Sequence, residues 1–172
     1  MNAVQPRIDM KKQFGFSLLE AMVAVAIIAI LAAMAIPSYL FKITREQIEA
    51  SIQLTVETAQ PAVAASWKTT QTFPADNTQA GLPSADRIVN NFVRSVAIED
   101  GAIHITFGNR ANGRLKDKVL TLRPAVIEDA PMVPITWVCG SGDAPEKMVI
   151  KGADRTTLPK EMLPIVCKPR PK

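Results

Sequence analysis

A long, nearly unbroken apolar segment follows the first fifteen residues of the chain, and apolar and polar positions are interspersed along the rest. From residue 16 to residue 36 every side chain is apolar except those of Ser17 and Glu20. A helix over this range would be about 32 Å long, which is enough to cross the roughly 30 Å of hydrocarbon in a bilayer. The pattern therefore predicts a membrane-spanning helix.

The helical pattern continues past the apolar segment. Apolar residues recur every three or four positions at Ile48, Ile52, Val56, Ala59, Val63 and Trp67. This spacing places them on one face of an amphipathic helix, so we expect residues 37–67 to prolong the first helix. Two prolines interrupt this range. Pro37 is expected to kink the helix, and Pro61 to kink it again or to mark a boundary.

The remaining pattern predicts a loop followed by strands. Residues 68–90 are rich in Thr, Asn, Asp, Gly and Pro, as in exposed loops. Four predicted strands follow at residues 92–99, 103–107, 119–123 and 135–139. Asp100 and Gly101 form a hairpin signal between the first two. The fold class is therefore α+β, with a four-stranded antiparallel sheet on the outer half of a long amino-terminal helix.

The carboxy-terminal part contains both cysteines of the chain, Cys139 and Cys167. Prolines and glycines punctuate the sequence between them, so we expect little regular structure there. An even cysteine count favours one disulfide if the chain is exported. That bridge would close a loop and stabilise the fold by roughly 3–4 kcal/mol in the chain-entropy model.

Three interpretations compete for the amino-terminal segment. It could be a secretory signal cut at the A-x-A site of residues 33–35, a plain membrane anchor, or a specialised signal cut before the apolar run. The first would sever an apparently continuous helix. The second leaves Glu20 unexplained, because an ionisable group costs about 2.5–3.5 kcal/mol at the bilayer centre and less near its edge. No basic residue lies between Lys12 and Lys42 to pair with it.

Cleavage after Gly15 would create an α-amino group at Phe16, the one cation that the segment could supply itself. Residues 11–15, Lys-Lys-Gln-Phe-Gly, precede Phe-Ser-Leu-Leu-Glu and the apolar run. This combination resembles the class III signal of type IV pilins. The resemblance implies a prepilin peptidase that cuts between Gly15 and Phe16 on the cytoplasmic face and N-methylates Phe16. Pro37 and Tyr39 match residues common in that family after the apolar run.

The other end of the chain also resembles this family. The strand that ends at Cys139, with two Leu-Pro pairs before Cys167, is similar to the cysteine-bounded terminal region of type IVa pilins. The resemblance divides the chain into a leader (1–15), a transmembrane and filament-core helix (16–36), an amphipathic continuation (37–67) and a globular head (68–172). The head would hold an αβ-loop, the sheet and the cysteine-bounded loop.

The resemblance implies a structural subunit that forms a homopolymer. The subunit would wait in the bacterial inner membrane, with its amino terminus cytoplasmic and its head periplasmic, until the pilus assembly machinery adds it to an extracellular filament. Glu20 would then pair with the Phe16 amine of a neighbouring subunit. Adhesion, twitching motility and DNA uptake are the roles it implies, with a host surface or DNA as further partners. Alternatives are a minor pilin, a type II secretion pseudopilin, or a membrane-anchored periplasmic binding domain that does not polymerise.

Composition gives little support to catalysis. The net charge is +4, from 20 basic and 16 acidic side chains, and there is one histidine. No nucleophile–base pair, phosphate loop or metal-ligand spacing is recognisable, so we expect no enzyme, no metal and no cofactor. His104 alternates onto the polar side of its strand and is expected to be exposed or partly covered, rather than catalytic. Trp67 and Trp137 have the phases of core residues between helix and sheet.

One loop is strongly basic, with Arg110, Arg114, Lys116 and Lys118. Such a cluster could capture DNA or an anionic surface, or it could simply be a solvated loop. No aromatic residue is interleaved for stacking on bases, which favours the solvated loop.

Overall fold

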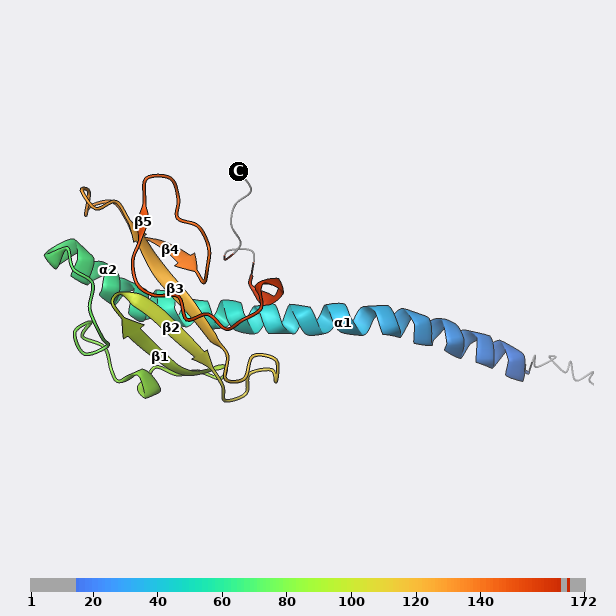
Figure 1. Ribbon diagram of the computed structural model, residues 1–172. Coiled ribbons are helices and arrows are strands. Elements are labelled where there is room, and N and C mark those ends of the chain that lie inside the picture. Colours follow the sequence, from blue (N-terminus) through green and yellow to red (C-terminus); the bar gives the residue numbers. More distant parts are fainter. Residues whose placement is uncertain (1–14, 165–166, 168–172) are drawn as a thin grey trace, which may run out of the picture. The chain divides into compact units, whose positions relative to one another are not determined.

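The computed structural model describes residues 15–164 and residue 167 (Figure 1). The expected leader up to residue 14, including Lys11 and Lys12, lies outside the described residues. The chain forms two compact units, Met1–Tyr39 and Leu40–Lys172, which are described separately below.

Two consecutive helices replace the single long helix that the periodicity predicts. Helix α1 spans Leu18–Glu57 and remains helical through Pro37, so a kink at that proline stays a prediction. Helix α2 spans Ala59–Thr70 and is separated from α1 by Thr58, whose backbone angles are φ −124° and ψ −77°. Pro61 lies in the first turn of α2, where a missing N–H breaks no helical hydrogen bond. The boundary therefore falls just before this proline.

The part of α1 that belongs to the carboxy-terminal unit buries a more polar face than the apolar spacing suggests. Ile48 is fully buried, but Val56 is 43% exposed, contrary to the predicted face. Thr44, Ser51 and Thr55 are buried instead. Each hydroxyl donates a hydrogen bond to a main-chain carbonyl one turn earlier, at 2.7–2.8 Å, which satisfies it inside the core. Short hydroxylic side chains thus fill core positions that the hydrophobic pattern did not include in the buried face.

The sheet is an antiparallel meander with one additional short strand. Its strands are β1 (Val93–Glu99), β2 (Ala102–Phe107), β3 (Val119–Val126), β4 (Thr136–Cys139) and β5 (Val149–Ile150). The order is β1-β2-β3-β4, and β5 pairs with β3. The four expected strands are therefore confirmed. The two-residue β5 was not predicted, because it lies in the Pro- and Gly-rich segment between the cysteines.

The hairpin between β1 and β2 has the predicted two-residue turn. Asp100 and Gly101 have φ angles of +47° and +80°, and the flanking residues Glu99 and Ala102 are paired. Positive φ at both central positions is typical of a two-residue hairpin turn whose backbone twist matches the right-handed twist of the flanking strands.

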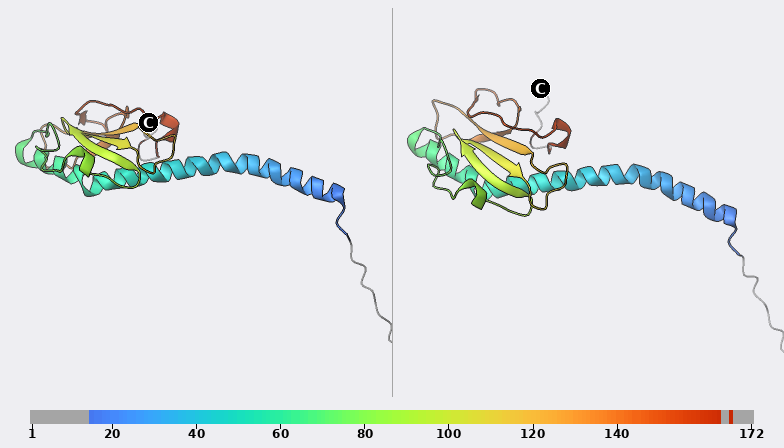
Figure 2. Two further views of the ribbon diagram at one scale, coloured as in Figure 1. Left: turned by 90° about the horizontal axis from the view of Figure 1, so that it is seen from below. Right: turned by 60° about the horizontal axis from the view of Figure 1, so that its bottom comes forward.

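The core of the carboxy-terminal unit joins the helices to one face of the sheet (Figure 2). Its fully buried members include Ile48, Ala59, Val63, Val93, Val96, Ile103, Ile105, Phe107, Leu115 and Leu120. Trp67 is buried and stacks on Phe73 with ring centroids 4.8 Å apart, and Trp137 packs against this core. The disulfide between Cys139 and Cys167 is present, and both cysteines are buried. The expected α+β architecture is confirmed.

Candidate functional site

The candidate site lies at the amino-terminal end of α1. Helix α1 begins at Leu18, and the Ala21 N–H donates a hydrogen bond to the Ser17 carbonyl at 3.1 Å. Glu20 therefore lies in the first helical turn, where a negative charge interacts favourably with the free N–H groups of the helix end. The favourable interaction of Glu20 with the helix end thus offsets part of the cost of placing a carboxylate in this apolar segment.

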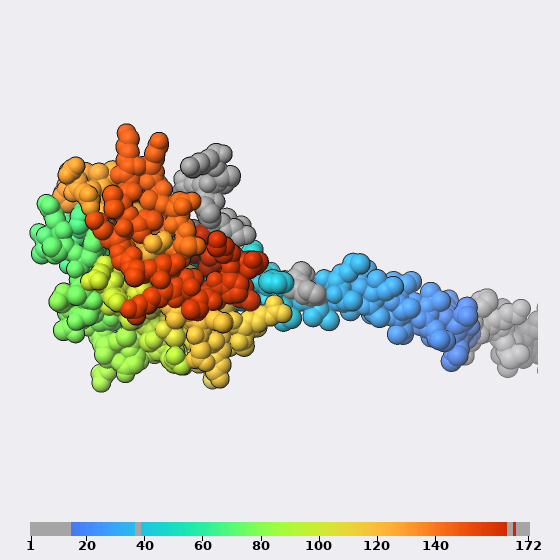
Figure 3. Space-filling view, in the orientation of Figure 1, coloured from blue at the N-terminus to red at the C-terminus, as the bar shows by residue number. Residues whose placement is uncertain are grey.

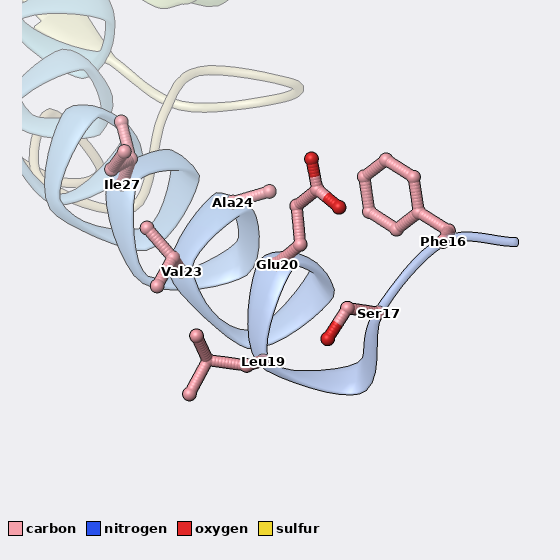
Figure 4. Close-up of a pocket in the computed structure, with 7 residues that line it drawn as sticks. All are labelled: Phe16, Ser17, Leu19, Glu20, Val23, Ala24 and Ile27. Atoms are coloured by element: carbon pink, nitrogen blue, oxygen red, sulfur yellow. The ribbon is translucent and has the colours of Figure 1, made fainter. Parts of the chain in front are cut away.

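Glu20 and Phe16 border the same shallow hollow on the helix surface (Figure 4). The hollow is lined by Phe16, Ser17, Leu19, Glu20, Val23, Ala24 and Ile27. Figure 4 shows the Glu20 carboxylate turned toward the side of the helix where the Phe16 ring lies, while the Ser17 hydroxyl points away from it. Glu20 is therefore the one charged residue among those that line the hollow, and the others except Ser17 are apolar.

The Glu20 carboxylate is exposed and makes no hydrogen bond or ion pair within residues 15–164. The side chains around it are exposed too, with Leu18 at 80% and Leu19 at 73%. This stretch of α1 is long and apolar enough to cross a bilayer. An apolar surface of this size requires a cover of lipid or of other protein.

His104 is the clearest correction to the sequence-based expectations. It is 5% exposed, and so buried rather than exposed or partly covered, because the carboxy-terminal segment around Arg155 covers that face of β2 and β3. The His104 Nδ1 lies 3.0 Å from the Thr121 hydroxyl, and its Nε2 lies 3.5 Å from a Glu99 carboxylate oxygen. Burial, reinforced by the nearby Arg155 guanidinium, lowers the pKa of His104 despite the opposing effect of Glu99. A buried neutral histidine has a structural role here.

The covering segment is held on β3 through threonine hydroxyls. The Thr121 N–H donates to the Thr156 hydroxyl at 3.0 Å, and the Val119 N–H donates to the Thr157 hydroxyl at 2.8 Å. The Arg155 N–H donates in turn to the Thr121 hydroxyl at 3.0 Å. These bonds extend the sheet sideways without a regular strand. No hydrophobic periodicity marks such a segment, which is why the sequence did not indicate it.

Asn77 is a second structural residue that the pattern did not reveal. It is 8% exposed although it lies in the loop between α2 and β1. Its side-chain amide donates to the carbonyls of Val96 and Pro83, both at 3.0 Å, and accepts from the Ile98 N–H. The one available signal was its place in an Asp-Asn turn sequence, which predicts a turn but not a partner 19 to 21 residues away.

A long apolar helix with an acid in its first turn, joined to a disulfide-bonded α+β unit, defines a class of proteins whose amino-terminal helix can anchor them in a membrane. The comparisons with known proteins agree with this class. Residues 10–36 match the prokaryotic N-terminal methylation motif, and residues 49–168 match the family described as pilin (bacterial filament). The chain belongs to the pilin family and is a structural subunit of a type IV pilus.

Relatives of known name support the same assignment. The chain is 34% identical to the type IV major pilin protein PilE of Neisseria gonorrhoeae over 129 residues, which cover 74% of each chain. It is also 34% identical to a fimbrial protein of Neisseria meningitidis, over 74% of this chain and 73% of the relative. A PilE1 protein of N. gonorrhoeae is 30% identical over 163 residues, 91% of this chain and 87% of the relative.

Proposed function

We propose that this chain is a major pilin precursor, cut between Gly15 and Phe16 and methylated at Phe16 by a prepilin peptidase. Before assembly the segment 16–36 holds the subunit in the inner membrane, with the amino terminus cytoplasmic and the carboxy-terminal unit periplasmic. The assembly machinery then moves it into an extracellular homopolymer. The chemistry of the subunit is assembly rather than catalysis. Relatives named as major pilins favour the main subunit over a minor pilin or a pseudopilin.

The proposed cleavage is supported by the local structure around Gly15. A Cβ built on Gly15 meets no atom within 4 Å, so nothing inside the described chain requires a glycine there. An external group that approaches the backbone closely would require one, because only glycine lacks a side chain. The methylation motif that spans residues 10–36 includes this position.

The observation that carries the proposal is the Glu20 carboxylate, which lies in an apolar surface and pairs with none of the residues that the structure describes. In a filament core formed by these helices, water leaves and an unmatched carboxylate would be costly. The α-amino group created at Phe16 of a neighbouring subunit provides the opposite charge. Pairing through a repeated, non-closing interface would favour one axial register and generate a helical polymer. Glu20 is thus costly in an isolated subunit and matched in the filament.

The assembled filament is proposed to act in adhesion, twitching motility or DNA uptake. Cells that lack the subunit should lose each activity in which the filament takes part, and separate assays of attachment, spreading and transformation distinguish the three. A host surface or DNA would be the external partner in the first or the last case.

Intact-mass analysis of the purified subunit tests the processing. The mature chain should begin at Phe16 and carry one added methyl group. A chain that begins at Met1 or at Ile36 would contradict the proposal and favour an anchored binding domain or a secreted protein.

Variants of Glu20 test the assembly role. Glu20→Ala should still be cut and inserted, because removal of a charge improves a bilayer span, but it should yield no sheared filaments when it is the sole subunit. Ser17→Ala, which removes the other polar side chain of the segment, serves as the matched control and should assemble normally. Normal filament yield from Glu20→Ala would contradict the pairing.

A further inference from the structure

The basic loop between β2 and β3 contains no aromatic residue, but α1 supplies one. The guanidinium carbon of Arg114 lies 5.4 Å from the centre of the Phe41 ring, within the range of a cation–π interaction. Phe41 remains 45% exposed, and the preceding Leu40 is 39% exposed. The loop and the first turn of α1 in the carboxy-terminal unit thus form one mixed surface of cations and apolar side chains.

The loop is fixed on α1 rather than free in solvent. The Asn112 N–H donates to the Gln47 side-chain oxygen at 2.8 Å, and Leu115 is fully buried in the core. The four basic side chains of the loop, Arg110, Arg114, Lys116 and Lys118, are all exposed. Figure 3 shows the loop, in yellow, protruding from the surface beside α1. We call the set Leu40, Phe41, Arg110, Arg114, Lys116 and Lys118 the basic collar.

Nearby acids do not neutralise the collar. Asp117 lies within the loop, but its carboxylate pairs with Arg94 of β1 at 2.7 Å. Glu46 on α1 lies 3.9 Å from Lys42, one turn before it. Each of these acids therefore has a partner outside the collar, and the four collar cations remain in excess.

The position of the collar in the chain points to the bilayer surface. Phe41 follows the end of the apolar segment, Ile36, by five residues. Chain connectivity keeps the two within about 18 Å in any conformation, and within about 8 Å where the chain is helical. A subunit held by residues 16–36 therefore carries its collar close to the phospholipid headgroups, whatever the orientation of the carboxy-terminal unit.

We propose that the basic collar binds the anionic phospholipid headgroups of the membrane that holds the subunit before assembly. The inference rests on the proposed anchoring by residues 16–36. Phe and Leu side chains next to Lys and Arg are typical of surfaces that lie in the bilayer interface, and each Lys or Arg near an anionic surface strengthens binding about fivefold. Single-stranded DNA is the weaker match, because it requires several stacking platforms, whereas the collar has one ring and Arg114 lies against it. The contact would hold the carboxy-terminal unit on the membrane until the subunit is extracted.

Lysine labelling in nanodiscs tests this contact on the full-length chain. The protein is inserted in phosphatidylcholine nanodiscs with or without phosphatidylglycerol, and amine acetylation under single-hit conditions is followed by peptide mass spectrometry. Lys68 and Lys147, which are exposed elsewhere, are internal controls. Acetylation of Lys116 and Lys118 should slow at least fivefold relative to these controls when phosphatidylglycerol is present, and high salt should reverse the effect.

Variants of the collar and matched variants outside it distinguish a loss of the lipid contact from a general effect on the fold. Arg110→Gln/Arg114→Gln should restore fast acetylation of Lys116 and Lys118, whereas Arg87→Gln, an exposed cation of the loop before β1, should not. Phe41→Ala should weaken the protection, and Val56→Ala, an exposed apolar residue on the same helix, should leave it unchanged.

Three results would overturn the proposal. Equal acetylation in both lipids refutes the lipid contact but leaves cleavage and filament assembly, which mass analysis and shearing report independently. Protection by an added oligonucleotide in phosphatidylcholine alone, with none from phosphatidylglycerol, assigns the collar to nucleic acid. A chain that separates from the nanodiscs refutes the anchoring and the lipid contact together.

Discussion

The Asn77 side-chain oxygen accepts a hydrogen bond from the main-chain N–H of Ile98 at 2.7 Å. The amide group of the same side chain donates to the Val96 carbonyl at 3.0 Å. Strand β1 lies at one edge of the sheet, and its other side pairs with β2. One loop asparagine therefore satisfies two main-chain groups at the free edge of β1 and closes part of that edge to pairing with another chain.

Replacement of Asn77 by Ala should destabilise the fold by about 2–4 kcal/mol. The change leaves the Ile98 N–H and the Val96 carbonyl buried without partners, and each unsatisfied group costs about 1–3 kcal/mol. Urea unfolding followed by circular dichroism measures the change. Gln79→Ala is the matched control, since the Gln79 side chain bonds the Ala75 N–H at an exposed position. It should cost under about 0.5 kcal/mol. Equal losses in the two variants would refute the role of Asn77.

Local pattern was sufficient to predict the helical segment and the four longer strands, and to single out Glu20 as a candidate residue. Alternation at Ile103, Ile105 and Phe107 predicted β2, and all three residues are buried in the core. Glu20 could be singled out because a carboxylate in an apolar run conflicts with the local environment, and such conflicts often mark functional positions. The presence of a charge in the apolar run was enough to select Glu20, and no knowledge of the tertiary structure was needed.

The errors concern side chains whose surroundings are set by distant parts of the chain. His104 is buried because the segment around Arg155, beyond β4 and β5, lies across the sheet. Val56 is exposed and Thr55 is buried in its place, because the buried face of the helices runs through Ser51, Thr55 and Ala59. Alternation and periodicity describe one element at a time. They therefore assign faces correctly only where a single neighbouring layer determines burial.

The burial of His104 predicts a loss of stability in mild acid. The pKa of His104 is lowered in the folded protein by burial and by Arg155, so the unfolded chain takes up a proton more readily. Stability should be full above the unfolded pKa of about 6.5 and should fall as the pH drops from there toward the folded pKa. The slope is at most about 1.4 kcal/mol per pH unit.

Unfolding free energies measured from pH 8 to pH 5 test this expectation. His104→Gln should remove the fall in this window while other groups titrate as before. Glu99→Gln should enlarge the fall, because the Glu99 carboxylate raises the pKa of His104. Parallel curves for the wild type and His104→Gln would show that another group is responsible.

Loss of the disulfide should destabilise the protein by about 3–4 kcal/mol. Cys139 and Cys167 are 28 positions apart, and cross-linking a loop of this size restricts the unfolded chain. The variant Cys139→Ala/Cys167→Ala should show this loss in urea unfolding. Reduction of the wild type under the same conditions is the control, because it breaks the cross-link without deleting the buried sulfur atoms. Identical midpoints for oxidised and reduced wild type would contradict the prediction.

Three glycines allow backbone strain to be separated from a steric clash. Gly101 has φ +80°, and a Cβ there would lie 2.6–2.8 Å from three side-chain atoms of Phe73, whose ring stacks on Trp67. Gly81 has φ +71° with nothing within 4 Å, and Gly113 has the same open space without a positive φ. Unfolding measurements on the three alanine variants therefore form a graded series.

Gly113→Ala should be neutral or stabilising by up to about 1 kcal/mol, because it restricts the unfolded chain. Gly81→Ala should cost about 1–2 kcal/mol, the penalty for an L-residue in the left-handed region. Gly101→Ala should cost more than Gly81→Ala, since Phe73 must also shift and disturb its stack on Trp67. Near-ultraviolet circular dichroism, which reports the environment of Trp67, should change for Gly101→Ala alone. If Gly101→Ala and Gly81→Ala are equally destabilised with unchanged aromatic spectra, the tight approach of Phe73 to the hairpin contributes nothing to stability.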